Sequence, residues 1–111
     1  MVRPRKRRIL SIAPRSAVYK PAGVPLNDLV RVSLLYEELE ALRLSDLESL
    51  TQEQAARQMG VSRSTYQRIL TRARRQVSLA LVKGLALHVE GGTFAVAPSR
   101  RRLKFTHGKP K

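Results

Sequence analysis

The tightest constraint on the fold comes from residues 51–69, which have the sequence TQEQAARQMGVSRSTYQRI. Thr51 can cap a helix whose first turn carries Glu53, because a hydroxyl oxygen and a negative charge both suit the exposed N–H groups there. Gly60 stands where a left-handed backbone is inexpensive, so the first helix can end and the chain can turn. Ser62 can then cap a second helix. The spacing predicts two helices joined by a tight turn, as in helix-turn-helix motifs whose second helix enters the DNA major groove.

The second helix of this motif is expected from Arg63 to about Val82, and Gly84 is expected to end it. Its apolar residues recur at helical spacing and predict a buried stripe: Tyr66, Ile69, Leu70, Ala73, Val77 and Ala80. The opposite side is polar and basic, with Ser64, Arg68, Thr71, Arg72 and Arg75. A plain helical hairpin would share the alanines and the glycine of the motif. The concentration of arginine on one side favours the DNA-binding interpretation.

Charge points the same way. The chain of 111 residues is long enough for one small domain. It carries 22 Lys and Arg against 8 Asp and Glu, a net charge of +14, which indicates a polyanionic partner. Most acids lie between residues 28 and 53, whereas residues 1–20 and 98–111 contain none. We therefore expect a domain of mixed charge with a basic segment at each end.

The expected fold is mainly α: a helix-turn-helix core of about three helices with a small β-hairpin and basic disordered termini. A helix is predicted over 35–48, with leucines facing the core and with Glu37, Glu38, Glu40 and Arg43 facing water. Residues 9–12 predict a short strand, residues 29–34 fit either a strand or a helix, and Gly91-Gly92 predicts a hairpin over 85–96. The expected organisation is a basic arm (1–14), a helix-turn-helix domain (15–97, motif 51–70) and a basic disordered tail (98–111).

The candidate DNA contacts follow from the position of each residue on the second helix. Its first turns should reach base edges, and Arg and Gln can each hold a purine with two hydrogen bonds. We assign this role to Arg63, Ser64, Gln67 and Arg68, whereas Thr65 would contact a phosphate or only cap the helix. Later arginines and the N-terminal arm should contact phosphates, the arm also having access to a minor groove. These residues are Arg72, Arg75, Arg5, Arg7 and Arg8, and the alternative is that they are solvated surface charges.

Several other functions have little support in the sequence. The chain contains no cysteine, which excludes disulfides and thiolate metal sites, and its two histidines, His88 and His107, lie far apart. No Ser-His-Asp arrangement or glycine-rich phosphate loop is apparent, so we expect no enzyme activity, no cofactor and no metal. No apolar run is long enough to span a bilayer or to form a signal peptide, so a cytoplasmic, nucleoid-associated location is expected.

Three segments also carry a family resemblance: KPAGVPL at 20–26, ELEALRLSDLESLTQEQAARQMGVSRSTYQRIL at 38–70, and ARRQVSLALVKGLALHVEGG at 73–92. They resemble a family of small uncharacterised prokaryotic proteins that are described as DNA-binding, with a helix-turn-helix similar to region four of sigma factors. The resemblance covers about residues 3–94. It implies that Arg63, Ser64, Thr65, Gln67 and Arg68 face DNA. Members often carry cysteines near the basic N-terminal segment, and since this chain has none, a metal or redox role is not expected there.

The sequence thus predicts a sequence-specific double-stranded DNA-binding protein that regulates transcription. One alternative is a sigma-like interaction module that docks on RNA polymerase through the acidic helix. Another is a nonspecific basic protein bound to RNA or to the ribosome. A homodimer would be compatible with reading two half-sites, with the 85–96 hairpin or Val77 and Leu81 in the contact.

Overall fold

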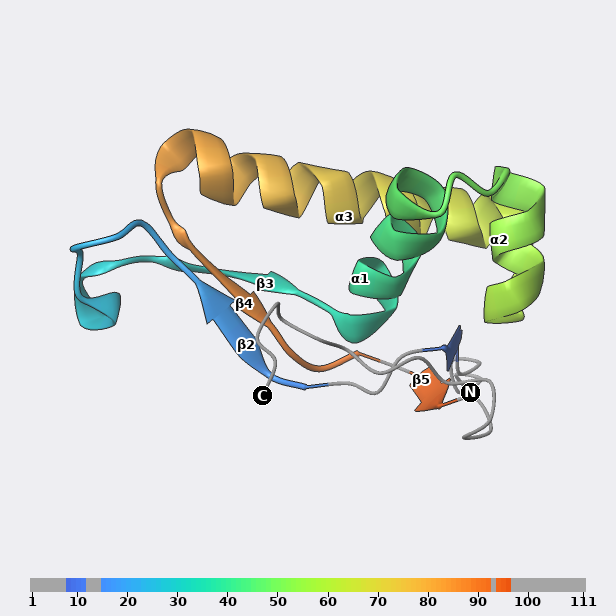
Figure 1. The fold of residues 1–111 in the computed structure, drawn as a ribbon, viewed down its shortest axis with the longest axis horizontal. Coiled ribbons are helices and arrows are strands. Elements are labelled where there is room, and N and C mark those ends of the chain that lie inside the picture. The colour runs from blue at the N-terminus through green and yellow to red at the C-terminus, as the bar shows by residue number, and fades with distance from the viewer. Residues whose placement is uncertain (1–7, 12–14, 93, 97–111) are drawn as a thin grey trace, which may run out of the picture.

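The structure is a computed structural model that describes residues 8–11, 15–92 and 94–96 (Figure 1). Three helices, α1 (Tyr36–Leu42), α2 (Gln52–Met59) and α3 (Arg63–Lys83), combine with short strands. The strands are β1 (Arg8–Leu10), β2 (Ala17–Tyr19), β3 (Arg31–Leu34), β4 (Ala86–Val89) and β5 (Phe94–Val96). One 3-10 turn, η1 (Leu26–Asp28), precedes β3, and one π-helical turn, η2 (Arg43–Leu47), continues α1. The expected three helices are present, but the fold is mixed α/β and not mainly α.

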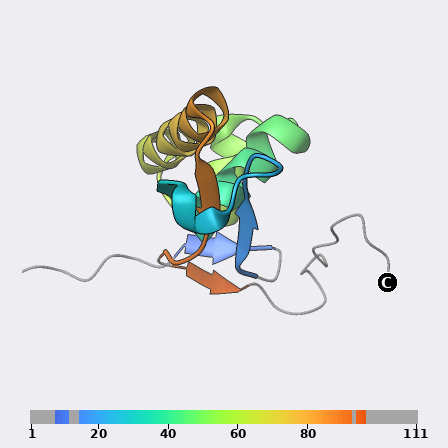
Figure 2. The ribbon, with the colours of Figure 1, turned by 90° about the vertical axis from the view of Figure 1, so that its left-hand side faces the viewer.

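The strands form two separate small sheets. Strand β4 lies in the middle of a three-stranded sheet, antiparallel to β2 and parallel to β3, with Leu87 opposite both Tyr19 and Val32. Strands β1 and β5 pair in parallel and lie side by side below the helices (Figure 2). Residues 29–34, which fitted a strand or a helix, thus contain strand β3, and the strand expected over 9–12 is β1 at residues 8–10.

The hairpin predicted over 85–96 was wrong, because β4 and β5 belong to different sheets. Both edges of β4 are already occupied by β2 and β3, so no edge is left for β5. Gly91 and Gly92 do have positive φ angles, 73° and 111°. They carry the chain past the start of α1, where the Tyr36 N–H donates to the Gly91 carbonyl at 3.0 Å, instead of turning it back.

The helix ends around the turn at residues 60–62 agree with the sequence analysis. Thr51 and Gln54 form a reciprocal capping box: the Gln54 N–H donates to Thr51 Oγ1 at 3.1 Å, and the Thr51 N–H to Gln54 Oε1 at 3.0 Å. Gly60 adopts the left-handed conformation at φ 69° and ends α2. Ser62 Oγ accepts the Thr65 N–H at 3.1 Å and caps α3.

Helix α3 contributes residues to both hydrophobic clusters of the core. Near its N-terminal end, Tyr66, Ile69 and Leu70 pack with α1, η2 and α2 through Ala41, Leu44, Ala55, Ala56 and Met59. Further along, Ala73 packs with Leu34 of β3 and Val89 of β4, between α3 and the three-stranded sheet. The predicted apolar stripe is thereby confirmed, with Val77 partly buried and Ala80 4% exposed. One face of α3 is committed to the core, which leaves its opposite face outward.

The acidic helix is the largest departure from expectation. Glu37, Glu38 and Glu40 were predicted to face water, but they are 2%, 2% and 0% exposed. Each lies against an arginine from another position of the chain: Arg8, Arg72 and Arg43 respectively. A buried carboxylate is tolerated when a cation and hydrogen bonds compensate its lost hydration. Arg43 and Arg72 supply both to Glu40 and Glu38, and Arg8 places a positive charge 3.7 Å from Glu37. These three glutamates therefore cannot serve as the polymerase docking face expected on the acidic helix, whereas Asp46 and Glu48, further along that segment, are exposed.

Candidate nucleic-acid interface

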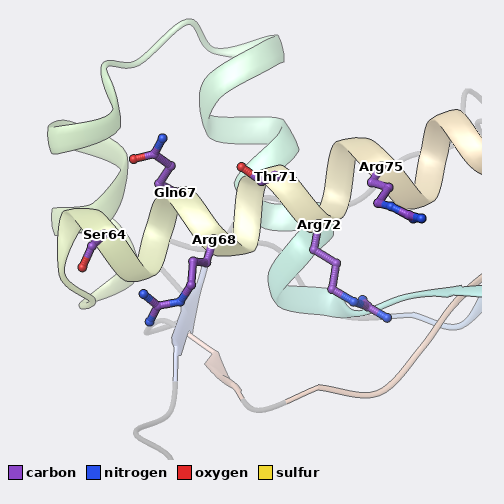
Figure 3. Close-up of a pocket in the computed structure, with 6 residues that line it drawn as sticks. All are labelled: Ser64, Gln67, Arg68, Thr71, Arg72 and Arg75. Carbon is purple, nitrogen blue, oxygen red and sulfur yellow. The ribbon is translucent and has the colours of Figure 1, made fainter.

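A shallow open groove runs along the outward face of α3 (Figure 3). Among the described residues, those that line it are exposed and come from this one helix: Ser64, Gln67, Arg68, Thr71, Arg72 and Arg75. They recur every three or four residues, so the helical period places them on one side, opposite the buried Tyr66 and Ala73. Within the part of the chain that the structure describes, the groove is lined by three guanidinium groups and three neutral polar groups and by no acidic side chain.

The structure brings together most of the residues assigned to this helix from the sequence. Ser64, Gln67, Arg68, Arg72 and Arg75 all line the groove. Arg63 is exposed but does not line the groove, and Thr65 is half-buried. Thr71 lines the groove and was not among the predicted site residues. Its place one turn beyond Gln67 and Arg68 on the polar side was the signal that could have identified it.

Thr65 supports its neighbours instead of lining the groove. Its Oγ1 accepts hydrogen bonds from Ser62 Oγ at 3.0 Å and from Arg68 Nη2 at 3.2 Å. The helix cap and the first groove arginine are thus linked through one side chain. We infer that Thr65 limits the freedom of the Arg68 guanidinium at the N-terminal end of the groove.

The arginines of α3 are not equivalent. Arg74 projects away from the groove to η2, where its Nη2 lies 2.6 Å from Asp46 Oδ1 and its Nε 3.2 Å from Asp46 Oδ2. This hydrogen bonding lowers the pKa of the Asp46 carboxyl and raises the pKa of Arg74. Arg72 pairs with the buried Glu38, yet its side chain stays 47% exposed on the groove. Arg74 is therefore paired beside η2, whereas Arg72 keeps access to a ligand in the groove.

Strand β1 lies against the turn between α2 and α3. A Cβ atom at Gly60 would come 3.3 Å from Ile9 Cδ1, which fixes how close β1 is to this turn. Arg8, which the sequence suggested as a phosphate contact, is 9% exposed, and its Nε lies 3.7 Å from Glu37 Oε2. It lies on the inner side of β1. Arg5 and Arg7, the other predicted contacts of the arm, and the tail 98–111 lie outside the described residues.

The histidine in β4 has two polar neighbours. His88 Nε2 lies 3.3 Å from Ser16 Oγ and 3.3 Å from Glu90 Oε1. Both partners meet the same ring nitrogen, whereas a catalytic triad uses one nitrogen for the nucleophile and the other for the carboxylate. Across residues 8–11, 15–92 and 94–96, no group of three or more His, Cys, Asp or Glu side chains is placed to hold a metal ion. In the same part of the chain, every helix is too short or too polar to cross a membrane.

The fold and the groove define a small mixed α/β protein with a basic groove along α3. A family profile described as "Protein of unknown function DUF134" matches residues 1–97, and the chain belongs to this family. A UPF0251 protein of Halothermothrix orenii is 50% identical over 97 residues, covering 87% of this chain and 72% of the relative. A UPF0251 protein of Desulforudis audaxviator is 53% identical over 102 residues, covering 92% of this chain and 67% of the relative.

A third relative, a UPF0251 protein of Dehalococcoides mccartyi, is 55% identical over 94 residues, which cover 85% of this chain and 80% of the relative. No solved structure matches the chain. These matches confirm membership of a bacterial family of small proteins. The DNA-binding role that the resemblance implied stays a prediction.

Proposed function

We propose that this protein binds double-stranded DNA in a sequence-specific manner and regulates transcription, with α3 in the major groove. The observation that carries the proposal is the exposed groove on the outward face of α3, whose described lining residues are arginines and neutral polar side chains and include no acid. The order of elements supports the proposal: α2 and α3 are capped helices joined by a tight turn, as in a helix-turn-helix, whose second helix reads DNA. The groove residues 64–75 extend about 17 Å along the helix axis, and the B-DNA major groove admits a helix of this kind.

Each part of the groove has a role under this proposal. Gln67 and Arg68 lie in the first turns of α3, which penetrate deepest, so they would hold adenine and guanine edges respectively. Ser64 and Thr71 flank them with hydroxyl groups that can donate or accept a hydrogen bond. Arg72 and Arg75 lie further along the helix and would contact phosphates. Arg5 and Arg7 keep their assignment from the sequence, as contacts of a phosphate or of a minor groove.

The alternatives fare differently. Docking on RNA polymerase cannot use the buried Glu37, Glu38 and Glu40, so under this alternative the exposed Asp46 and Glu48 would have to make the contact. Nonspecific binding to RNA or DNA remains the main competitor, because a net charge of +14 is sufficient for it. Specific binding requires residues that contact base edges, whereas nonspecific binding requires only charge. Sequence preference is therefore the property to measure.

A selection of binding sites from random duplex DNA at near-physiological salt tests the proposal. It should be run with the wild type, with Arg68→Ala and with Arg31→Ala. Arg31 is an exposed arginine at the start of β3, where it is paired with Ala86 just beyond the C-terminal end of α3. Arg31→Ala therefore removes the same charge as Arg68→Ala, but at a position away from the groove.

The wild type and Arg31→Ala should enrich the same motif, whereas Arg68→Ala should lose preference at the position that Arg68 contacts, a change of about 1–3 kcal/mol in discrimination. An unchanged motif with Arg68→Ala would remove Arg68 from the reading site. No enrichment with the wild type, together with binding that vanishes as salt rises, would leave charge alone as the cause of binding.

A further inference from the structure

Both carboxylate oxygens of Glu38 are used. Oε1 accepts a hydrogen bond from the Leu35 N–H at 2.9 Å, and Oε2 accepts one from Arg72 Nη1 at 2.5 Å. The Glu38 side chain is only 3% exposed, whereas that of Arg72 is 47% exposed. The buried Glu38 carboxylate, which is held by the Leu35 N–H at the start of α1, therefore binds Arg72, whose exposed part lines the groove of α3.

This arrangement affects what Arg72 can do. A long side chain loses rotamer freedom when it grips a ligand, and a side chain already held in place loses less. The guanidinium has further N–H donors beyond the one on Glu38, and its planar fork matches a phosphate. Figure 3 shows Arg68 and Arg72 extending to the same side of α3, so one passing DNA strand could meet both.

We propose that Glu38 is a positioning residue for DNA binding: it holds the Arg72 guanidinium at the edge of the groove so that its outward N–H groups meet a DNA phosphate. This inference rests on the proposed function and adds to it a residue that does not itself touch DNA. The second partner on Glu38, Leu35, keeps the carboxylate from following Arg72 when DNA binds.

The sign of one substitution separates positioning from bulk electrostatics. Glu38→Gln removes a negative charge, and a more positive protein should bind a polyanion more tightly if only net charge mattered. Gln has a single acceptor oxygen, which the Leu35 N–H already requires. Its amino group then faces the Arg72 donors, so the guanidinium is released. Positioning therefore predicts weaker DNA binding despite the gain in positive charge.

The test is fluorescence anisotropy of the full chain on one labelled duplex with wild type, Glu38→Gln, Arg72→Ala and the double variant. Glu53→Gln is the matched control, because Glu53 is an exposed acid on α2 and its loss changes the net charge equally. Glu38→Gln should weaken binding by roughly fivefold, and the double variant should bind no more weakly than Arg72→Ala, since neighbours that act together are not additive. Arg72→Ala should lower the salt slope by about one, and Glu53→Gln should not weaken binding.

Binding by Glu38→Gln as tight as wild type, or tighter, overturns the proposal. An equal loss in the Arg72→Ala background also overturns it, because a general structural effect would not depend on Arg72. Thermal melting identifies a variant that fails to fold. If Glu38→Gln fails to fold, Arg72→Lys tests the Glu38–Arg72 pair through the arginine, and weaker binding is expected although the charge is unchanged. If the wild type binds every duplex alike, the proposed function fails, while the same cycle still reports whether Glu38 positions Arg72.

Discussion

Glu40→Gln should destabilise this protein far more than Glu48→Gln, although both carboxylates pair with the same arginine. Arg43 donates to Glu40 from Nε at 3.0 Å and from Nη2 at 3.1 Å, and to Glu48 from Nη1 at 3.2 Å. The Glu40 side chain is 1% exposed and that of Glu48 is 46% exposed. The two substitutions therefore remove one charge each from a buried and from a hydrated site around a common partner.

The magnitude follows from counting donors. Oε1 of Glu40 accepts from Arg43 Nε, and Oε2 accepts both from Arg43 Nη2 and from the Ser11 N–H at 3.0 Å. Whichever way the amide of Gln turns, its amino group meets at least one N–H donor. At least one charge-assisted hydrogen bond is lost inside the protein, which costs about 2–3 kcal/mol. The Glu48 site can turn its amide oxygen toward Arg43 or admit water, so its loss should cost no more than about 1 kcal/mol.

Urea unfolding followed by circular dichroism, with linear extrapolation, measures both costs. For a domain of this size the Glu40→Gln change corresponds to a fall in Tm of about 10–20 °C. Equal losses of unfolding free energy for the two variants would refute the reasoning, because they would mean that the Glu40 carboxylate is as hydrated as that of Glu48 and that Arg43 adds no stability there.

Two further changes test the turn and the core around the groove. Gly60→Ala should lower the free energy of unfolding by about 1–2 kcal/mol because its backbone is left-handed. Gly84 has nearly the same φ, but a Cβ there meets nothing, whereas a Cβ at Gly60 meets Ile9, so Gly60→Ala should cost more than Gly84→Ala. Equal unfolding free energies for the two variants would contradict the Ile9 contact. Tyr66→Phe should remove a pH dependence of stability, because burial raises the pKa of the Tyr66 hydroxyl, partly offset by the hydrogen bond with Ser45. A raised folded-state pKa gives stability that is complete below the ordinary tyrosine pKa of about 10 and is lost as the pH rises above it. The free-energy gap between wild type and Tyr66→Phe should thus narrow above that pH, and a constant gap would contradict it.

The parts of the fold that were predictable are encoded within a few residues of one another. The capping box of Thr51 and Gln54, the left-handed Gly60 and the cap at Ser62 are interactions over three residues or less, so their pattern survives in the sequence. The groove belongs to the same class, because it is built from one helix. A residue such as Thr71 shares the face of Gln67 and Arg68 by helical period alone.

The parts that were missed depend on contacts between distant segments. Periodicity showed that Glu38 and Glu40 share no stripe with the leucines, but it could not distinguish water from arginines supplied by other elements. Glu38 meets Arg72 across 34 positions, and Glu40 meets the Ser11 backbone across 29. The same limit applies to β4, whose partners β2 and β3 lie far before it in the chain, so the local glycine pair suggested a hairpin that those partners exclude.

The central claim is that the outward face of α3 binds duplex DNA, and amide chemical-shift mapping of labelled protein titrated with the selected duplex tests it most directly. The largest changes should fall on residues 62–75, with smaller ones at the turn and at β1 beside it. Changes confined to the three-stranded sheet or to α1 and η2, with α3 unaffected, would contradict the claim and place the nucleic-acid contact elsewhere on the protein.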